Sequence, residues 1–369
     1  MTLYYCGWNG CGQASQSSGS SIIIRQPIKL NFDEPVIGVS CSWSTLAVVA
    51  GKSVIIMGFI ENCLNVRKEI SLGSDCQPLQ LSSCLGRTLI TCSKGNCYDY
   101  NTESNKLREL VKFTISEPEL EESPSNENST ITKVCCSDFG SLALSKSGKV
   151  FTIPSPLALQ SIVVTDIACG NNHYVLLTEN GSVFTWGDGS RGQLGHGNLE
   201  SEEKPRLVEA LSGIQVLRIS AGAWHNAVVS SSGDLYTWGW GTDGQLGIDE
   251  EVEEEDDGNT PIAVKKLKMD EEVSLLQKRN EKYRGIVLAC PSPVDTFTDV
   301  NTVSCGSRHT IVLLVDGTVW GCGWNAYGQL ACPPEDCFRS IRFRQISIPN
   351  FQGKILSVQC GGWSSCFIV

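Results

Sequence analysis

The middle of the chain repeats one pattern of short apolar runs separated by glycine turns. Residues 169–195, 221–247 and 305–331 align without gaps. In each segment a β-branched run, a glycine turn and a second apolar run follow one another, as in HTIVLLVDGTVWG at 309–321. Apolar runs of this length around a turn glycine are typical of antiparallel strands joined by tight hairpins. Each segment is therefore predicted to form a small antiparallel sheet.

Glycine and histidine spacing defines the repeat more sharply than the apolar runs do. Each segment carries three glycines eleven residues apart, with a histidine three residues after the first glycine. The positions are Gly170, Gly181, Gly192 and His173; Gly222, Gly233, Gly244 and His225; and Gly306, Gly317, Gly328 and His309. One such sheet cannot bury both of its faces alone. Radial stacking of the sheets buries them against one another, which predicts a β-propeller.

Weaker copies of the repeat extend the ring to seven blades. Blades are expected to start near residues 41, 84, 137, 170, 222, 306 and 361. Residues 360–369 match only the first half of a repeat, whereas CGWNGCGQ at 6–13 matches the second half at 322–329. The prediction is an all-β, seven-bladed propeller that forms one domain over residues 1–369. Its last blade is split between the termini and completed by residues 4–13, which leaves no free sheet edge.

Two polar segments interrupt the repeat. Residues 116–130 are predicted to be a polar loop. Residues 249–290 form an acidic insertion, whose run from Asp249 to Asp257 is read either as a solvating loop or as a docking site for a basic partner. Asp270 is a suitable N-cap for a short helix within this insertion.

Composition narrows the class of partner. The chain has 369 residues, is 41% hydrophobic and carries a formal net charge of −11, so it lacks the basic balance of a protein that binds DNA through phosphates. No apolar run reaches the length of a membrane span, and the N-terminus does not resemble a secretory signal. The 18 cysteines contain no CxxC pair, which favours buried thiols in a reducing compartment over zinc or disulfides. A monomer without a metal or cofactor of its own is expected.

Two motifs that suggest chemistry have a simpler structural interpretation. GDGSRG at 187–192 and GWGTDG at 239–244 fit the GxGxxG pattern of dinucleotide sites, but they recur in register with the repeat and no helical pattern follows. Three of the four histidines occupy one repeat position, which favours packing over catalysis, and the remaining one is His196. The chain is therefore predicted not to be an enzyme.

The repeat, CG-x-x-H followed by a glycine turn and WG-x-G-x-x-GQLG, resembles the regulator of chromosome condensation repeat family. The resemblance is strong over residues 165–331 and weaker over nearly all the rest. The family implies a seven-bladed propeller closed by a split blade. In detail, AGAWHNAVVSSSGDLYTWGWGTDGQLG, CGSRHT, the short N-terminal half-blade and the acidic insertion are similar to a family member that partners a JmjC-domain lysine demethylase.

That resemblance implies a function as well as a fold. It implies a non-catalytic adaptor that binds a JmjC-domain oxygenase, with histone H3 as a further partner, and that acts at chromatin in the nucleus, with the cytoplasm as a second location. Histone H3 lysine methylation and chromosome segregation would then be the processes affected. Iron and 2-oxoglutarate would belong to the partner. The alternative is a guanine-nucleotide exchange factor for a small GTPase, the activity of the founding family member.

Tryptophans that depart from the repeat supply the candidate site. Trp186 and Trp238 occupy a regular position, with Cys322 in the next blade, and are expected to pack between blades. Two further sets share positions where other blades carry Asp, Asn or Arg. These sets are Trp8, Trp240 and Trp324, and Trp43, Trp224 and Trp363. Because polar residues are accepted there, both positions are expected to be partly exposed.

These tryptophans belong to contiguous blades and define one arc of the ring. The predicted partner-binding residues are Trp8, Trp224, Trp240, Arg308, Trp324, Asn325, Tyr327 and Trp363. Trp, Tyr and Arg are the residue types most enriched at interface hot spots. Two alternatives stay open at this point: the arc docks a protein, or its indoles fill gaps between blades. The sequence also leaves open whether the two tryptophan sets share one face of the propeller.

Overall fold

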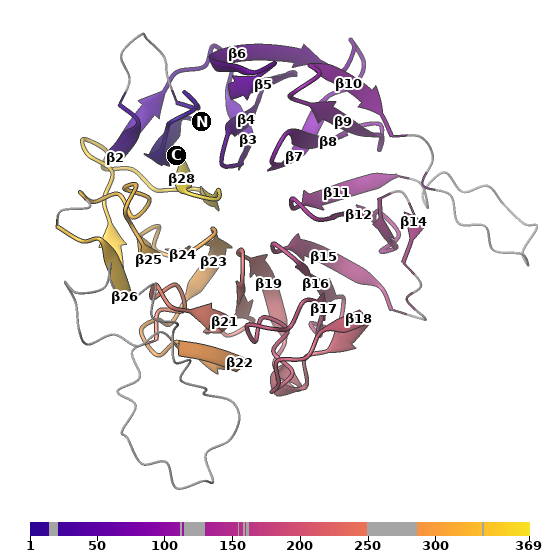
Figure 1. Cartoon of the computed structure of the whole chain (residues 1–369), viewed down its shortest axis with the longest axis vertical. Helices are drawn as coiled ribbons and strands as arrows, with labels where there is room; N and C mark the ends of the chain where they lie inside the picture. Colours follow the sequence, from indigo (N-terminus) through magenta and orange to yellow (C-terminus); the bar gives the residue numbers. More distant parts are fainter. Residues whose placement is uncertain are drawn as a thin grey trace, which may run out of the picture.

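A ring of antiparallel sheets forms the body of the protein, as a computed structural model shows (Figure 1). The structure describes residues 1–14, 21–110, 113, 130–153, 155–157, 159, 162–248, 286–333 and 336–369. These residues form seven four-stranded sheets arranged radially around a central channel. Their one helical element is the 3-10 turn η2 (Glu209–Leu211). The predicted seven-bladed propeller is confirmed.

Every blade has the same strand order from the channel outwards. The innermost strands are β3 (Val36–Cys41), β7 (Pro78–Cys84), β11 (Ile131–Cys136), β15 (Val164–Cys169), β19 (Val216–Ala221), β23 (Val300–Cys305) and β27 (Ser357–Cys360). The second strands are β4 (Thr45–Ala50), β8 (Arg87–Cys92), β12 (Ser141–Ser145), β16 (His173–Thr178), β20 (His225–Ser230), β24 (His309–Leu314) and β28 (Ser364–Ile368). The third strands are β5 (Ser53–Ile60), β9 (Cys97–Asn101), β13 (Val150–Thr152), β17 (Val183–Gly187), β21 (Leu235–Gly241), β25 (Val319–Trp324) and β1 (Leu3–Trp8). The outer strands are β6 (Cys63–Ser71), β10 (Lys106–Glu109), β14 (Ser155–Pro156), β18 (Glu202–Leu207), β22 (Ile286–Pro293), β26 (Arg339–Ile346) and β2 (Ile23–Leu30).

Burial follows the position of a strand within its blade. The second strand of blade 5, β20, is buried at all six positions because both faces of its sheet pack against neighbouring blades. The innermost strand β19 is buried at only two positions, because its other residues face the channel or its rim. The predicted blade starts coincide with the ends of innermost strands. The glycine signal used to place them follows the first strand of each blade instead of preceding it.

The split blade differs from its predicted boundaries. The N-terminus supplies two strands, β1 and β2, so its contribution reaches Leu30 and does not end at residue 13. β1 lies between β2 and β28, and Leu3 pairs with Ile368. β2 shows no alternation of buried and exposed residues, since its pairing with β1 shifts register between Tyr5 and Gly7. That irregularity explains why the sequence pattern did not reveal a strand there.

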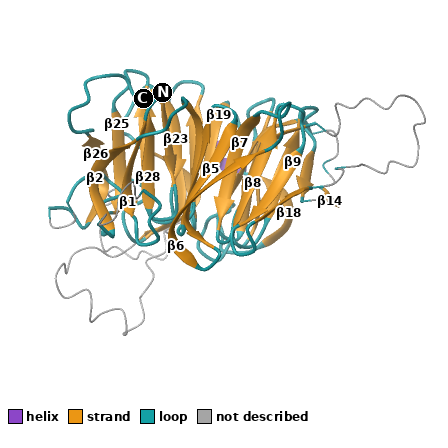
Figure 2. Cartoon of the chain, turned by 90° about the horizontal axis from the view of Figure 1, so that it is seen from above, coloured by secondary structure: helices purple, strands orange, loops and turns teal. Residues whose placement is uncertain are grey.

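Backbone hydrogen bonds join the chain ends at the rim of this blade. Thr2 N–H donates to Val369 O at 2.9 Å, and Val369 N–H donates to Thr2 O at 3.0 Å. Figure 2 places both ends side by side on one face of the disc. The predicted split-blade closure is confirmed.

The glycines of the GxGxxG segments have structural roles. Gly239 has a φ of 103°, and a Cβ on it would lie 2.5 Å from the Trp224 carbonyl oxygen. Gly244 has a φ of 86°, and a Cβ there would lie 2.6 Å from Ile341 Cα in the next blade. Positive φ and close backbone approach both require glycine. The segment therefore forms the close approach between blades that its register with the repeat predicted.

The repeat histidines connect neighbouring blades. Nε2–H of His173, His225 and His309 donates to Asn226 Oδ1, Thr310 Oγ1 and Ser365 Oγ of the following blade, at 2.8, 2.9 and 3.1 Å. Each of those acceptors donates in turn to a carbonyl of the blade that holds the histidine, Gln193 O, Gln245 O and Gln329 O respectively. All three imidazoles are fully buried, so they hold blades together and do not reach solvent.

Parts of both predicted insertions lie outside the described residues. This applies to the polar segment apart from Thr130, and to the acidic insertion, with the helix expected at Asp270, up to residue 285. The insertion was predicted to extend to residue 290, but Ile286 begins β22, the outer strand of blade 5. No helix of the described part is long and apolar enough to span a bilayer.

Candidate functional site

The two tryptophan sets lie on one face of the propeller. Innermost and third strands run in the same direction, so the loops that follow them open on the same face, opposite to the chain ends. Trp224 follows β19 and Trp240 lies near the end of β21. Their ring centroids are 5.2 Å apart at an interplanar angle of 79°. The sequence left open whether the two tryptophan sets share one face, and the antiparallel topology places them on the same one. We call this side of the disc the tryptophan face.

Two arginines join the indoles of neighbouring blades. Arg191 Cζ lies 4.6 Å from the Trp224 ring centroid and 4.8 Å from that of Trp240. Arg308 Cζ lies 5.3 Å from Trp240, 6.0 Å from Trp324 and 5.9 Å from Trp363. These distances fall within the range of cation–π attraction. Arg308 thus connects rings from blade 5, blade 6 and the split blade.

Arg308 is fixed by a buried carboxylate. Its Nη1 lies 3.3 Å from Asp243 Oδ2, and the Asp243 side chain is only 8% exposed. Burial raises the pKa of Asp243 above its ordinary value, and the positive charges of Arg308 and Arg339 oppose that rise. The ion pair therefore positions the guanidinium plane between the rings at some desolvation cost.

A second group of rings continues the surface around the split blade. Trp8 lies 5.1 Å from Tyr327 and stacks on Trp43 at 6.2 Å with an interplanar angle of 16°. Tyr327 also contacts Trp363 at 5.7 Å. Beside them, Phe338 packs edge-on against Trp324 at 4.5 Å. We call the whole set the aromatic–arginine surface, and its members are Trp8, Trp43, Arg191, Trp224, Trp240, Arg308, Trp324, Tyr327, Phe338 and Trp363.

Seven of the eight predicted site residues come together in this surface, and Asn325 does not. Asn325 is 0% exposed. Its Nδ2 donates to Cys332 O at 3.1 Å and Cys337 O at 2.6 Å, and its Oδ1 accepts Leu330 N–H at 2.8 Å. The prediction for Asn325 is wrong, because its side chain is committed to holding a turn. Asn9 does the same in the split blade, where it accepts Ala14 N–H at 2.8 Å.

Arg191 and Asp243 were missed by sequence reasoning, although a signal for both exists. Each residue precedes the third glycine of its repeat, and Tyr327 occupies the same position in blade 6. Because Tyr327 is one of the predicted site residues, the same alignment also indicates Arg191 in blade 4 and Asp243 in blade 5. Phe338 lies outside the repeat motif and carried no such signal.

Exposure separates these rings from the tryptophans that pack between blades. Trp238 is 0% exposed and its Nε1–H donates to Gln193 O at 3.0 Å, and Trp186 is likewise buried, as predicted. On the aromatic–arginine surface, Trp43 is 46% and Phe338 51% exposed, and the other rings are half-buried. Their edges pack on one another while part of each ring stays accessible. Trp is rarely left accessible over so wide a patch without a partner.

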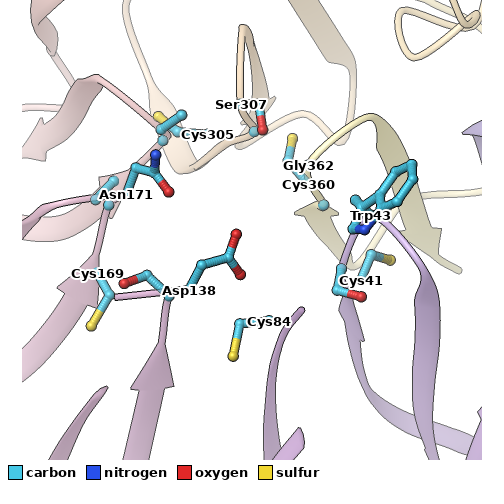
Figure 3. A pocket seen from close by; sticks show the side chains of 18 of the residues that line it. Cys41, Trp43, Cys84, Asp138, Cys169, Asn171, Cys305, Ser307, Cys360 and Gly362 are labelled. Carbon is cyan, nitrogen blue, oxygen red and sulfur yellow. The ribbon is translucent and has the colours of Figure 1, made fainter. Parts of the chain in front are cut away.

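The mouth of the central channel opens within the same face. A cavity of about 320 Å³ is formed there by the loops that follow the innermost strands of all seven blades. Trp43, Trp224 and Trp363 stand at its edge, where they join it to the aromatic–arginine surface. Figure 3 shows polar side chains around the cavity, among them Asp138, Asn171 and Ser307.

Cysteines encircle the channel. Six innermost strands end in cysteine and the seventh ends in Ala221. The six residues are Cys41, Cys84, Cys136, Cys169, Cys305 and Cys360. All 18 cysteines are unpaired thiols, and burial raises the pKa of Cys305, for example, to about 12. Within the described residues no group of three or more His, Cys, Asp or Glu side chains is arranged to hold a metal. The six thiols around the channel act as small, mostly apolar groups that are weak donors, as the contact of Cys360 Sγ with Ser304 O at 3.1 Å shows.

Comparisons with known proteins agree with this architecture. A model of the regulator of chromosome condensation (RCC1) repeat matches residues 180–229, 232–274 and 316–368. A second model of the same repeat matches 164–193, 216–245 and 300–329. Among solved structures, yeast RCC1 (Prp20) bound to Kap60 superposes with a TM-score of 0.78 at 17% identity, over 99% of this chain and 88% of that one. Human WBSCR16 gives 0.76 at 16% identity over the whole of both chains. These two structures support the fold alone.

Relatives by sequence extend over most of the chain. Mouse RCC1 domain-containing protein 1 is 29% identical over 97% of this chain and 94% of its own length. The human protein of that name is 37% identical over 53% of this chain and 54% of its own length. The Ultraviolet-B receptor UVR8 of Arabidopsis thaliana is 31% identical over 61% of this chain and 55% of its own. With three aligned repeats, seven blades and a relative that spans nearly its whole length, the chain belongs to the regulator of chromosome condensation repeat family.

Proposed function

We propose that this protein is a non-catalytic adaptor that binds a JmjC-domain oxygenase, a lysine demethylase, through the aromatic–arginine surface. The observation that carries the proposal is the concentration of six partly accessible tryptophans and two arginines on one face. Large rigid rings with adjacent guanidinium groups are the typical composition of interface hot spots. Membership in the repeat family supports a role in protein interaction.

The identity of the partner rests on a narrower argument. The tryptophan-rich blades, the short N-terminal half-blade and the acidic insertion resemble a family member that partners such an oxygenase. Action at chromatin in the nucleus, with histone H3 as a further partner, belongs to the same proposal. In this scheme the oxygenase supplies the iron and the 2-oxoglutarate. The propeller supplies a rigid docking surface.

A pull-down from nuclear extract, with bound proteins identified by mass spectrometry, tests the proposal. The intact chain is compared with Trp240→Ala/Trp324→Ala and with Phe139→Ala as a matched control. Phe139 is 66% exposed, and its loop opens on the same face but lies outside the aromatic–arginine surface. We expect the oxygenase to be retained by the intact chain and the control, and lost by the double variant with an unchanged melting curve. Equal retention by all three proteins would remove the surface from the proposal.

A second candidate, a guanine-nucleotide exchange factor, is favoured by the fold shared with yeast RCC1 (Prp20), whose crystal structure was described together with binding to Gsp1p and histones. Release of a labelled nucleotide from a small GTPase separates the two functions. An adaptor leaves the rate of release unchanged. Acceleration of release, together with a GTPase in the pull-down, would place exchange first.

A further inference from the structure

The cavity at the channel mouth contains a single charge. Among its lining residues Asp138 is the only acid, and no lysine, arginine or histidine is present. The remaining lining is made of cysteines, serines, glycines, alanines, one leucine, one asparagine and three tryptophans. Asp138 is exposed at the mouth of this cavity. A lone carboxylate in an otherwise uncharged concave lining attracts a positive charge, because no lining cation neutralises it.

Asp138 is oriented by the backbone of the neighbouring blade. Leu85 N–H donates to its Oδ1 at 2.9 Å. Figure 3 shows its carboxylate turned towards the open centre of the cavity. Arg87, a cation of the neighbouring blade 2, is already engaged, since its Nε donates to Asp99 Oδ1 at 2.9 Å and its Nη1 donates to Ser141 Oγ at 3.1 Å. The Asp138 carboxylate is therefore available to a ligand.

The tryptophans of the cavity edge differ in what already covers them. Trp224 has both Arg191 and Arg308 over its ring, and Trp363 has Arg308. Trp43 stacks on Trp8 and is 46% exposed, and within the described residues no cation lies over its ring. An incoming cation would thus meet uncovered π surface at Trp43, on the part of the propeller that blades 1 to 3 form.

We propose that this cavity receives one cationic side chain, a lysine or an arginine, from a partner polypeptide. The Asp138 carboxylate is the counter-ion, Trp43 contacts the cation and its alkyl stem, and Asn171 and Ser307 offer oxygen acceptors. A cavity of about 320 Å³ lies at the small end of the range for ligand sites, so a single side chain suits it better than a folded element.

The source of the cation follows from the surroundings of the cavity. Trp224 and Trp363 border it and continue into the aromatic–arginine surface, so residues flanking an inserted side chain would lie on those rings. A free amine would gain none of these contacts. The inference does not depend on which protein the surface binds, and it concerns a separate residue, Asp138, that the proposed function does not use.

Titration with short capped peptides tests the inference, with tryptophan fluorescence and calorimetry as readouts at low ionic strength. The probes are acetyl-Gly-Gly-Lys-Gly-Gly-amide, its arginine and norleucine counterparts, and n-butylamine. The variant is Asp138→Asn, which keeps an oxygen to accept Leu85 N–H but removes the charge. Asp316→Asn is the matched control, because Asp316 lies in an exposed turn outside the cavity and loses the same charge.

We expect the lysine and arginine peptides to bind at least tenfold more tightly than the norleucine peptide and than n-butylamine. Asp138→Asn should weaken their binding at least tenfold, whereas Asp316→Asn should not. Equal binding of the lysine and norleucine peptides, or an unchanged affinity in Asp138→Asn, would overturn the inference. Butylamine binding as tight as the lysine peptide would assign the cavity to free amines and would also overturn it. Failure here with the oxygenase still captured would leave the proposed function intact.

Discussion

Acidification should lower the free energy of unfolding of the propeller through the three histidines that connect its blades. Burial lowers the pKa of His173 and His309 to about 4 and that of His225 to about 3, against an ordinary value of 6.5. Charge repulsion from His173 and His309 contributes to the shift at His225, and Asp188 opposes the shift at His173. The Nδ1 atoms of these rings are buried with no hydrogen-bond partner among the described residues, so an added proton would find no acceptor.

The size of the effect follows from proton linkage. Between about pH 4 and 6.5 the unfolded chain binds a proton at each histidine and the folded chain does not, so the free energy of unfolding falls as the pH falls. At pH 5 each histidine should lower the free energy of unfolding by about 2 kcal/mol relative to pH 7.5, and the three together by about 6 kcal/mol. Within this window their combined slope is about 4 kcal/mol per pH unit.

Urea unfolding followed by tryptophan fluorescence at pH 7.5, 6 and 5 measures this slope. His225→Gln provides the comparison, since its amide can donate to Thr310 but does not titrate. The pH dependence of the variant's free energy of unfolding should be less steep by the contribution of one histidine, roughly 1.4 kcal/mol per pH unit. Identical slopes in the two proteins would refute the reasoning. So would C2–H resonances of His173, His225 or His309 that titrate near pH 6.5 in the folded protein.

Three further predictions concern single residues. Gly239→Ala should lower the free energy of unfolding by about 2–3 kcal/mol in chemical denaturation, because φ is positive and the new Cβ meets the Trp224 carbonyl oxygen. A decrease below about 0.5 kcal/mol, several-fold smaller than such strain costs, would contradict this. Asn325→Ala should cost about 1–3 kcal/mol in the same measurement, since it leaves two carbonyls and one N–H of its turn unpaired. Arg308→Lys should reduce partner retention in the pull-down while the melting curve stays unchanged, because an ammonium cannot stack between rings as a guanidinium does; full retention would show that the stacking is not used in binding.

The sequence predicted the architecture because the signals it carries are backbone requirements. Turn glycines such as Gly181 recur in blades that lack the histidine, as Gly95 and Gly148 do, so their spacing counts blades even where the rest of the repeat is weak. The outer strand β2 carried no comparable signal, because an edge strand with a register shift needs neither glycine nor strict alternation.

The candidate site was predicted less completely, for reasons visible in individual residues. The selection of tryptophans succeeded because Trp240 and Trp324 stand where other blades accept polar residues. Asn325 was misassigned because a polar residue beside an exposed ring can serve either a ligand or a turn, and only its hydrogen bonds distinguish these roles. Asp138 was not selected at all, since its importance comes from the six other loops that surround it and leave it the only charge in the cavity.

The split blade also constrains the order in which the molecule can be assembled during synthesis. β1 is among the first strands made, yet one of its two edges belongs to β28, among the last. Until β28 emerges, the nascent protein carries an unpaired strand edge next to incomplete blades, a feature that promotes pairing between chains. If β28 docks late, two chains can exchange this strand: the β1 of each chain then pairs with the β28 of the other, and the exchange restores every hydrogen bond of the closed ring.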